Sequence, residues 1–286
     1  MSGRYPGIES SNGGDGPGEI VFRDVEARYG NGPVALSGVN CRLQYGTCTA
    51  LIGSNGSGKT TLLRLLCGLF RPSAGMISPM PAKKSVALVA QYHGNQSWMP
   101  VTVASVLRMS RYSNQGLVRR LKAKDRELIE ESAERMDVAD LGDRQLGELS
   151  GGQRQRVLVA QALARDARIL LLDEPVAGLD LPSQKKILSI VEEERKRGRM
   201  VVMSTHNMHE TKFCDQCLLL ANRLVAVGTP SEVLSKENMQ EVFGPRMPHG
   251  DNHDLVFQDE NSDDSDEFMH FFDDHGHDHS HHHSGN

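Results

Sequence analysis

One segment of the sequence combines glycines, a lysine and hydroxyl side chains at a spacing that binds phosphate. Residues 53–60 read GSNGSGKT and fit the pattern G-x-x-x-x-G-K-[ST], between an apolar run and a helical pattern. The glycines let backbone N–H groups turn toward phosphate oxygens, and the helix start adds partial positive charge. Lys59 would reach the β- and γ-phosphates of a nucleotide, and Thr60 would offer its hydroxyl to Mg²⁺. The predicted nucleotide-binding residues here are Gly53, Ser54, Asn55, Gly56, Ser57, Gly58, Lys59, Thr60 and Thr61.

Two adjacent carboxylates follow a strongly apolar run. Residues 169–172 are Ile-Leu-Leu-Leu, and Asp173 and Glu174 come directly after them. A buried strand would deliver both acids to the carboxyl edge of a parallel sheet, where open α/β folds bind ligands. Asp173 would hold Mg²⁺ through water, and Glu174 would act as general base toward the attacking water. A strand followed by an acidic turn is common by itself, and its position downstream of a phosphate loop favours the catalytic interpretation.

A second anion-binding helix start is predicted shortly before these acids. Residues 149–156 read LSGGQRQR. Ser150 and the two glycines after it would present free N–H groups to a phosphate at a helix N-terminus. The alternative is a flexible Gly-Gly cap with no ligand.

With these motifs the sequence resembles the ATP-binding subunits of ATP-binding-cassette (ABC) transporters, whose signature is LSGGQ. The resemblance covers roughly residues 19–243. It implies ATP hydrolysis, with ATP and Mg²⁺ as cofactors. It also implies a homodimer in which two ATP molecules are held head to tail. The signature residues that would complete the site of the second copy are Ser150, Gly151, Gly152 and Gln153.

The resemblance assigns roles to further residues along the chain. Tyr29 would stack on adenine, although a core tyrosine at a strand end is the alternative. Gln91 would contact Mg²⁺ and relay the nucleotide state to the membrane partner, and Asp180 lies in AGLD, similar to the loop that crosses the dimer interface. His206 would contact the γ-phosphate, where the alternative is a surface histidine. The implied catalytic residues are Glu174, His206 and Gln91, and the implied Mg²⁺ ligands are Thr60, Gln91 and Asp173.

Strands alternate with helices along most of the chain, which predicts a mostly parallel sheet covered on both faces. Strands are expected at 20–27, 39–43, 47–52, 86–90, 168–173, 200–204, 217–221 and 224–227, and helices at 59–69, 151–165, 182–196, 208–214 and 230–242. Together with the resemblance, this gives an α/β P-loop NTPase core with an N-terminal antiparallel β-subdomain and an inserted helical subdomain at about 98–150. The predicted organisation is a disordered leader (1–18), a nucleotide-binding domain (19–245) and a disordered acidic, His-rich tail (246–286).

The composition is ordinary for a globular chain, with 38% hydrophobic and 24% charged residues. No apolar run is long enough to cross a bilayer, and residues 1–18 lack the apolar core of a signal peptide. The five cysteines are scattered, which favours reduced, buried thiols. Cys214 and Cys217 have CxxC spacing but no second pair, so we expect them in the core. These features indicate the cytoplasm, and the resemblance implies a peripheral subunit at the cytoplasmic face of the membrane.

Two segments further resemble zinc and manganese uptake systems within the family. They are EPVAGLD at 174–180 and WMPVTV at 98–103, shortly after Gln91. Such systems pair the ATPase with an integral membrane permease and use an extracytoplasmic metal-binding protein. Residues 92–120 would dock the permease, with Trp98 and Met99 as apolar contacts.

The last forty residues have a composition of their own. The whole chain has a net charge of −5. After Arg246 there are 11 acidic residues and no Lys or Arg, so residues 1–246 carry a net charge of +6. Nine of the 12 histidines follow Pro248, many at alternate positions among carboxylates. Imidazole and carboxylate suit Zn²⁺ and Mn²⁺, so the tail could bind Zn²⁺ and sense metal. Alternatively the histidines belong partly to a purification tag, the tail is only solvated and acidic, or it binds metal without consequence.

Other classes fit less well. Cassette ATPases that act on chromosomes need long coiled coils, no sustained heptads occur here, and no Lys/Arg stripe indicates nucleic acid as a partner. An exporter or another transport substrate remains the main alternative to metal uptake.

Overall fold

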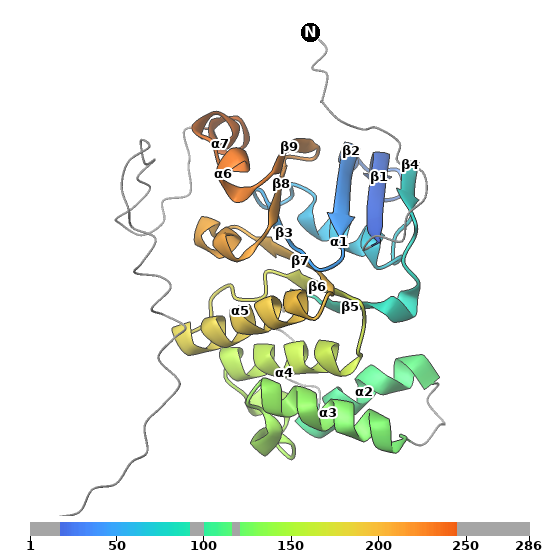
Figure 1. Cartoon of the computed structure of the whole chain (residues 1–286), viewed down its shortest axis with the longest axis vertical. Helices are drawn as coiled ribbons and strands as arrows, with labels where there is room; N and C mark the ends of the chain where they lie inside the picture. The colour runs from blue at the N-terminus through green and yellow to red at the C-terminus, as the bar shows by residue number, and fades with distance from the viewer. Residues whose placement is uncertain (1–17, 92–99, 116–120, 245–286) are drawn as a thin grey trace, which may run out of the picture. The chain divides into compact units, whose positions relative to one another are not determined.

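A six-stranded sheet carries the ends of four strands to one edge of the structure. The computed structural model describes residues 18–91, 100–115 and 121–244. The sheet order is β5-β6-β7-β3-β8-β9, parallel except between β8 and β9 (Figure 1). Its strands are β3 (Cys48–Ile52), β5 (Val86–Val89), β6 (Ile169–Asp173), β7 (Met200–Thr205), β8 (Gln216–Leu220) and β9 (Leu224–Gly228). β3, β6 and β7 are buried along their whole length, which explains their near-continuous apolar sequences.

A smaller antiparallel sheet packs on the other side of the first helix. Its order is β2-β1-β4, with β1 (Glu19–Arg28), β2 (Val34–Gln44) and β4 (Ala74–Ser78). Phe22 of β1 shares a buried cluster with Leu62 and Leu66 of α1 (Lys59–Leu66). β4 was not predicted, because only Ile77 of its five residues is buried and its pairing with β1 is non-local.

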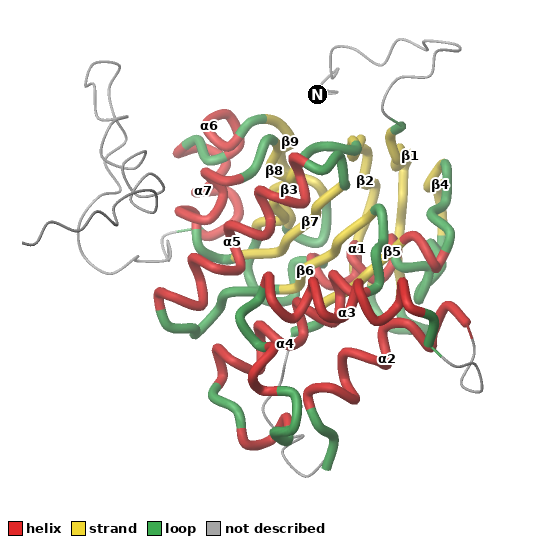
Figure 2. Tube along the Cα trace, turned by 60° about the horizontal axis from the view of Figure 1, so that its bottom comes forward, coloured by secondary structure: helices red, strands yellow, loops and turns green. Residues whose placement is uncertain are grey.

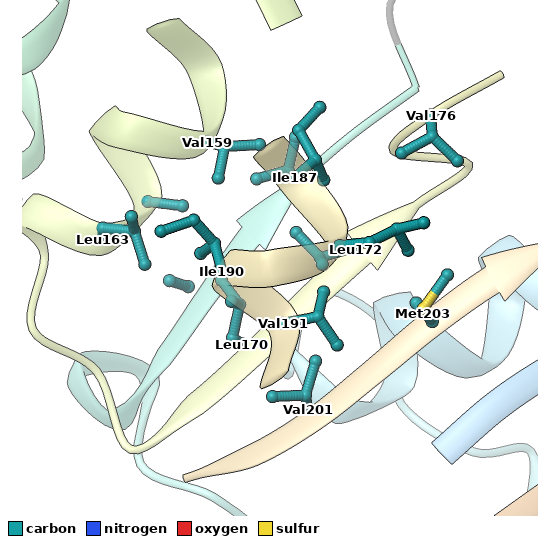
Figure 3. Close-up of a cluster of buried hydrophobic side chains, with 14 of the residues drawn as sticks. Val159, Leu163, Leu170, Leu172, Val176, Ile187, Ile190, Val191, Val201 and Met203 are labelled. Atoms are coloured by element: carbon teal, nitrogen blue, oxygen red, sulfur yellow. The ribbon is translucent and has the colours of Figure 1, made fainter. Parts of the chain in front are cut away.

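Helices cover the opposite face of the large sheet. α4 (Gly151–Ala164) and α5 (Leu181–Lys196) pack on β6 and β7, and Figure 3 shows Leu163, Ile190 and Leu170 meeting in this core. α2 (Val103–Gln115) and α3 (Ala123–Arg135) pack in turn on α4, on its side away from the sheet (Figures 1 and 2). The predicted α/β class, with an N-terminal antiparallel part and a helical insertion, is therefore confirmed.

Several element boundaries differ from the prediction. The first helix ends at Leu66 rather than at residue 69, and the helix predicted at 208–214 is the 3₁₀ helix η4 (Met208–Phe213). The predicted helix at 230–242 is divided into α6 (Pro230–Val233) and α7 (Lys236–Phe243), because the Ser235 side chain caps α7 by accepting from the backbone N of Asn238. The short 3₁₀ helices η1 (Lys83–Ser85), η2 (Ala139–Leu141) and η3 (Leu146–Glu148) complete the described elements. The predicted leader, except Gly18, and the predicted tail lie outside the described residues, so their boundaries stay predictions.

The cysteines behave as core residues. All five are free thiols; four are buried and Cys67 is partly buried. Burial raises the pKa of the Cys217 thiol to about 12, so it stays protonated and unreactive. The Sγ atoms of Cys48 and Cys214 lie 2.9 Å apart, a neighbourhood that the CxxC spacing did not indicate.

One buried carboxylate joins the helical insertion to the sheet core. Glu194, at the end of α5, is completely buried. It lies 2.6 Å from Arg135 Nη2 at the end of α3 and 2.7 Å from Arg199 Nη1 just before β7, and Arg197 Nη1 is 3.5 Å away. Because a buried charge is costly without its partners, this cluster fixes how α3 sits on α5.

We expect Glu194→Gln to lower the free energy of unfolding by about 3–5 kcal/mol, since three guanidinium groups would lose their shared counter-charge. Glu192→Gln is the matched control on the same helix, where partly exposed pairs with Arg195 and Lys196 contribute at most about 1 kcal/mol. Urea denaturation followed by circular dichroism measures both. Equal losses in the two variants would contradict a structural role for the cluster.

Candidate active site

The phosphate loop joins β3 to α1 and fits closely against two other elements. Gly53 has φ 154° and Gly58 has φ 104°, in the region that disfavours side chains. A Cβ on Gly53 would lie 2.3 Å from the carbonyl oxygen of Leu220, and a Cβ on Gly58 would lie 2.3 Å from Leu36 Cδ2. The two glycines are thus required both for the backbone turn and for the close approach of β8 and β2.

Lys59 spans the loop from inside. Its Nζ donates to Gly53 O at 2.7 Å and Ser54 O at 3.2 Å, and it lies 3.9 Å from Glu174 Oε1. Burial lowers the pKa of the lysine, while the charges of Glu174 and Asp173 oppose that shift. A buried ammonium group at the start of α1, beside the free N–H groups of its first turn, can bind an anion.

Thr60 and Asp173 supply oxygen atoms next to this lysine. Thr60 Oγ1 donates to Asp173 Oδ2 at 2.8 Å, and Ser204 Oγ donates to Asp173 Oδ1 at 2.6 Å. A hydroxyl beside a carboxylate fits Mg²⁺, which takes few protein ligands and completes its shell with phosphate and water oxygens. No cluster of three or more His, Cys, Asp or Glu suited to a metal occurs among the described residues.

Glu174 is the point where three strand ends meet. Its φ is 49°, unusual for a non-glycine residue, and its N–H donates to Ser204 Oγ at 2.9 Å. Gln91 Nε2 donates to its Oε2 at 2.9 Å, and His206 Nδ1 lies 3.8 Å from the same oxygen. Such backbone strain persists where surroundings enforce it, commonly at functional sites. A cavity of about 340 Å³ borders the site and is lined by Thr60, Leu63, Arg64, Leu88, Ala90, Gln91 and Asp173.

Tyr29 lies at the surface beside α1. The residue is 41% exposed, which does not fit the alternative of a core tyrosine. One face stacks on Phe70 with ring centroids 4.6 Å apart, and its hydroxyl is 3.2 Å from Thr61 Oγ1 and accepts from Arg64 Nη1 at 3.3 Å. Phe70 and Arg64 belong to no sequence motif, because only the fold brings them to Tyr29.

The signature residues begin α4. Ser150 Oγ accepts from Gln153 N, and Gln153 Oε1 accepts from Ser150 N, which forms a capping box. Ser150 and Gly151 are exposed. A Cβ on Gly152 would lie 2.5 Å from Asp180 Oδ1, so the start of α4 fits closely against the start of α5. A hydrogen bond from Ser183 lowers the pKa of the Asp180 carboxyl.

The predicted site residues therefore form two groups. Gln91, Asp173, Glu174 and His206 gather with the phosphate loop. In the described part of the chain, no hydrogen bond joins residues 150–153 to the phosphate loop.

Known proteins identify the family. A family model described as "ABC transporter" matches residues 36–177. The manganese transport system ATP-binding protein MntA of Synechocystis sp. is 39% identical, over 79% of this chain and 90% of its own length. The chain belongs to the ABC transporter family. Within this family it is an ATPase subunit that couples hydrolysis to transport.

Further relatives agree with this assignment. The manganese transport system ATP-binding protein MntB of Bacillus subtilis is 32% identical over 80% of this ABC subunit and 93% of its own length. YfeB of a chelated iron transport system in Yersinia pestis is 35% identical over 81% of each chain. A solved inward-facing metal-chelate type ABC transporter aligns with TM-score 0.70 and 28% identity, over 78% of this chain and 88% of its own. Among the described residues, no helix has the length and apolarity needed to span a bilayer.

We expect Glu174→Gln to lower ATP turnover by about 10²–10⁴-fold, because an amide cannot take a proton from water. Phosphate release from MgATP measures the rate. The same variant should still bind ATP in calorimetry, which serves as its folding control. Hydrolysis at the unmodified rate would rule out Glu174 as the base.

Proposed function

We propose that this ABC subunit energises the uptake of a divalent metal ion, manganese or zinc, through a separate membrane permease. The supporting observation is that relatives matching nearly the whole cassette, in Synechocystis, Listeria and Bacillus, are ATP-binding proteins of manganese transport systems. The second candidate is a chelated iron substrate, which YfeB and the metal-chelate transporter structure favour. Zinc rests on the sequence resemblance alone.

The nucleotide site is proposed around the phosphate loop. The loop N–H groups and Lys59 would bind the phosphates, with Lys59 exchanging its bonds to Gly53 O and Ser54 O for phosphate oxygens. Tyr29 would present its free ring face to adenine. Mg²⁺, when bound between Thr60, Asp173 and Gln91, supplies charge neutralisation for the phosphates.

Glu174 is proposed as the general base, and two neighbours orient it. The Gln91 amide donates a hydrogen bond to Glu174 Oε2, and this bond keeps the Glu174 carboxylate close to Lys59. His206, whose side chain is 60% exposed, stands beside the same oxygen and could reach a γ-phosphate from the solvent side. Because Gln91 directly precedes the segment proposed to dock the permease, a change at Glu174 can be passed toward the membrane.

A homodimer is proposed because each chain carries a phosphate loop and a signature segment, and these two parts of the proposed site do not meet within one chain. At the exposed start of α4 the capping box uses the N–H groups of Ser150 and Gln153, and those of Gly151 and Gly152 would be available to a phosphate. Leu181, next to Asp180, is 68% exposed, which suits burial against a second copy. In a two-fold arrangement the signature of one copy would close the phosphate loop of the other, and the reverse.

The permease is proposed to bind the helical insertion at the cytoplasmic face of the membrane. A groove of about 690 Å³ lies between α2 and α3, lined by apolar side chains such as Leu107 and Ile129 and by charged ones such as Arg108 and Glu130. An apolar floor with a charged rim suits a short amphipathic helix. Trp98 and Met99, predicted as contacts, lie outside the described residues. An extracytoplasmic metal-binding protein would complete an uptake system.

The acidic, His-rich tail is proposed to bind Zn²⁺ in the cytoplasm. This part lies outside the described residues, and the proposal rests on nine histidines among carboxylates after Pro248. Its function would be to sense the cargo rather than to hydrolyse ATP.

We expect cells lacking the gene to lose most uptake of radioactive manganese or zinc, and the full chain, but not Glu174→Gln, to restore it. Uptake of a chelated iron complex is measured in parallel. Loss of iron uptake alone would select the second candidate, and intact uptake of all three would refute the metal assignment.

In the same experiment a chain ending at Pro248 should still restore uptake, because it keeps the whole cassette. Calorimetry of the purified proteins should show Zn²⁺ binding by the full chain and its loss from the shortened one. Equal Zn²⁺ binding by both proteins would dismiss the proposed function of the tail.

A further inference from the structure

The turn between β8 and β9 binds the phosphate loop through a residue outside the known motifs. Asn222 has φ 54°, and its backbone N–H donates to Ser57 O at 2.9 Å. Its side-chain Nδ2 donates to Gly56 O at 2.9 Å and to Ala35 O of β2 at 3.1 Å. One residue therefore binds two consecutive carbonyl groups of the loop and ties them to β2.

These bonds set the direction of the loop's N–H groups. In a planar trans peptide the C=O and the following N–H point in opposite directions. Because the carbonyls of Gly56 and Ser57 point at Asn222, the N–H groups of Ser57 and Gly58 point the other way. The Ser57 N–H donates to Ser54 O at 3.1 Å within the loop, and Gly58 is the N-cap residue of α1. The Gly58 N–H therefore lies at the helix N-terminus, where backbone N–H groups bind phosphate.

The turn itself is held on both sides, so it can act as a fixed support. Ser37 N of β2 donates to Asn222 O at 2.8 Å. The next residue, Arg223, forms an ion pair with Glu241 of α7. The Leu220 carbonyl at the end of β8 is the atom that leaves no space for a side chain on Gly53.

The position of Asn222 requires a left-handed backbone conformation and a side-chain donor. Asn tolerates that conformation, and its side-chain amide supplies two N–H donors. Gly adopts the same conformation but has no side-chain donor, and the carboxylate of Asp can only accept hydrogen bonds. We propose that Asn222 is a positioning residue for ATP binding: it holds the phosphate loop from behind in the shape that accepts phosphate. This inference rests on the proposed nucleotide site and adds a residue to it.

The test compares Asn222→Gly, Asn222→Asp and the control Arg223→Gln. We expect the KM for MgATP to rise about ten-fold in Asn222→Gly, from the loss of two hydrogen bonds, with kcat little changed. Asn222→Asp should raise KM further, because a carboxylate would face the Gly56 and Ala35 carbonyl oxygens. Arg223→Gln removes an exposed ion pair on the other side of the turn, which contributes little to its stability, and should leave KM unchanged. Calorimetric Kd values for ATP should follow the KM values, and thermal melting checks that each variant is folded.

If Asn222 only set the conformation of the turn, the KM values of the variants would differ from these expectations. Gly and Asp would then serve as well as Asn, and wild-type KM in both variants would overturn the inference. A rise in KM of Arg223→Gln equal to that of Asn222→Gly would also overturn it, since the effect would come from the turn as a whole. Absence of ATP hydrolysis in the unmodified protein would instead refute the proposed site, so the two failures are distinguishable.

Discussion

Parallel pairing of β5, β6, β7 and β3 is the constraint on which the site depends. Parallel strands end at the same edge, and here the register pairs Asp173 with Ser204 and Ile52 with Thr205. The Ser204 hydroxyl then contacts both acidic residues: it donates a hydrogen bond to Asp173 Oδ1 and accepts one from the backbone N–H of Glu174. A one-residue slip in β6 would turn Asp173 to the other face of the sheet, and the contact with Thr60 would be lost. Burial of these strands on both faces is what fixes the register.

The second constraint is the separation of the two helix starts that are proposed to bind phosphate. α1 begins within the catalytic group, whereas α4 begins at an exposed capping box that is fixed against α5 by the contact of Gly152 with Asp180. The contacts that position each helix start all come from the same chain. In the proposed homodimer another copy would complete the site, and ATP would be the bridge between the two. Such an arrangement makes closure depend on the nucleotide, which is what a transport cycle needs.

How much the sequence predicts depends on whether a feature is local. The phosphate loop, the acids after β6 and the start of α4 are each runs of consecutive residues, so the sequence alone indicates them. The structure places both acids beside the phosphate loop and the start of α4 apart from them. Contacts of Tyr29 with Phe70 and of Asn222 with the loop join residues far apart in sequence, so no local pattern indicates them. β4 was missed for the same reason, since pairing with β1 rather than its own hydrophobicity makes it a strand. The last predicted helix is two helices, α6 and α7, because Ser235 caps the second one. The sequence pattern is helical on both sides of Ser235, so it does not indicate this break.

The central claim, an ATP site shared between two copies, is tested most directly by mixing two inactive variants. Lys59→Ala removes the phosphate-binding lysine, and Ser150→Arg blocks the signature. Neither variant alone should hydrolyse ATP, but a mixed dimer contains one intact site, formed by Lys59 of one chain and Ser150 of the other. We therefore expect phosphate release to reappear on mixing. A mixture as inactive as its components, or full activity of Ser150→Arg alone, would contradict the account.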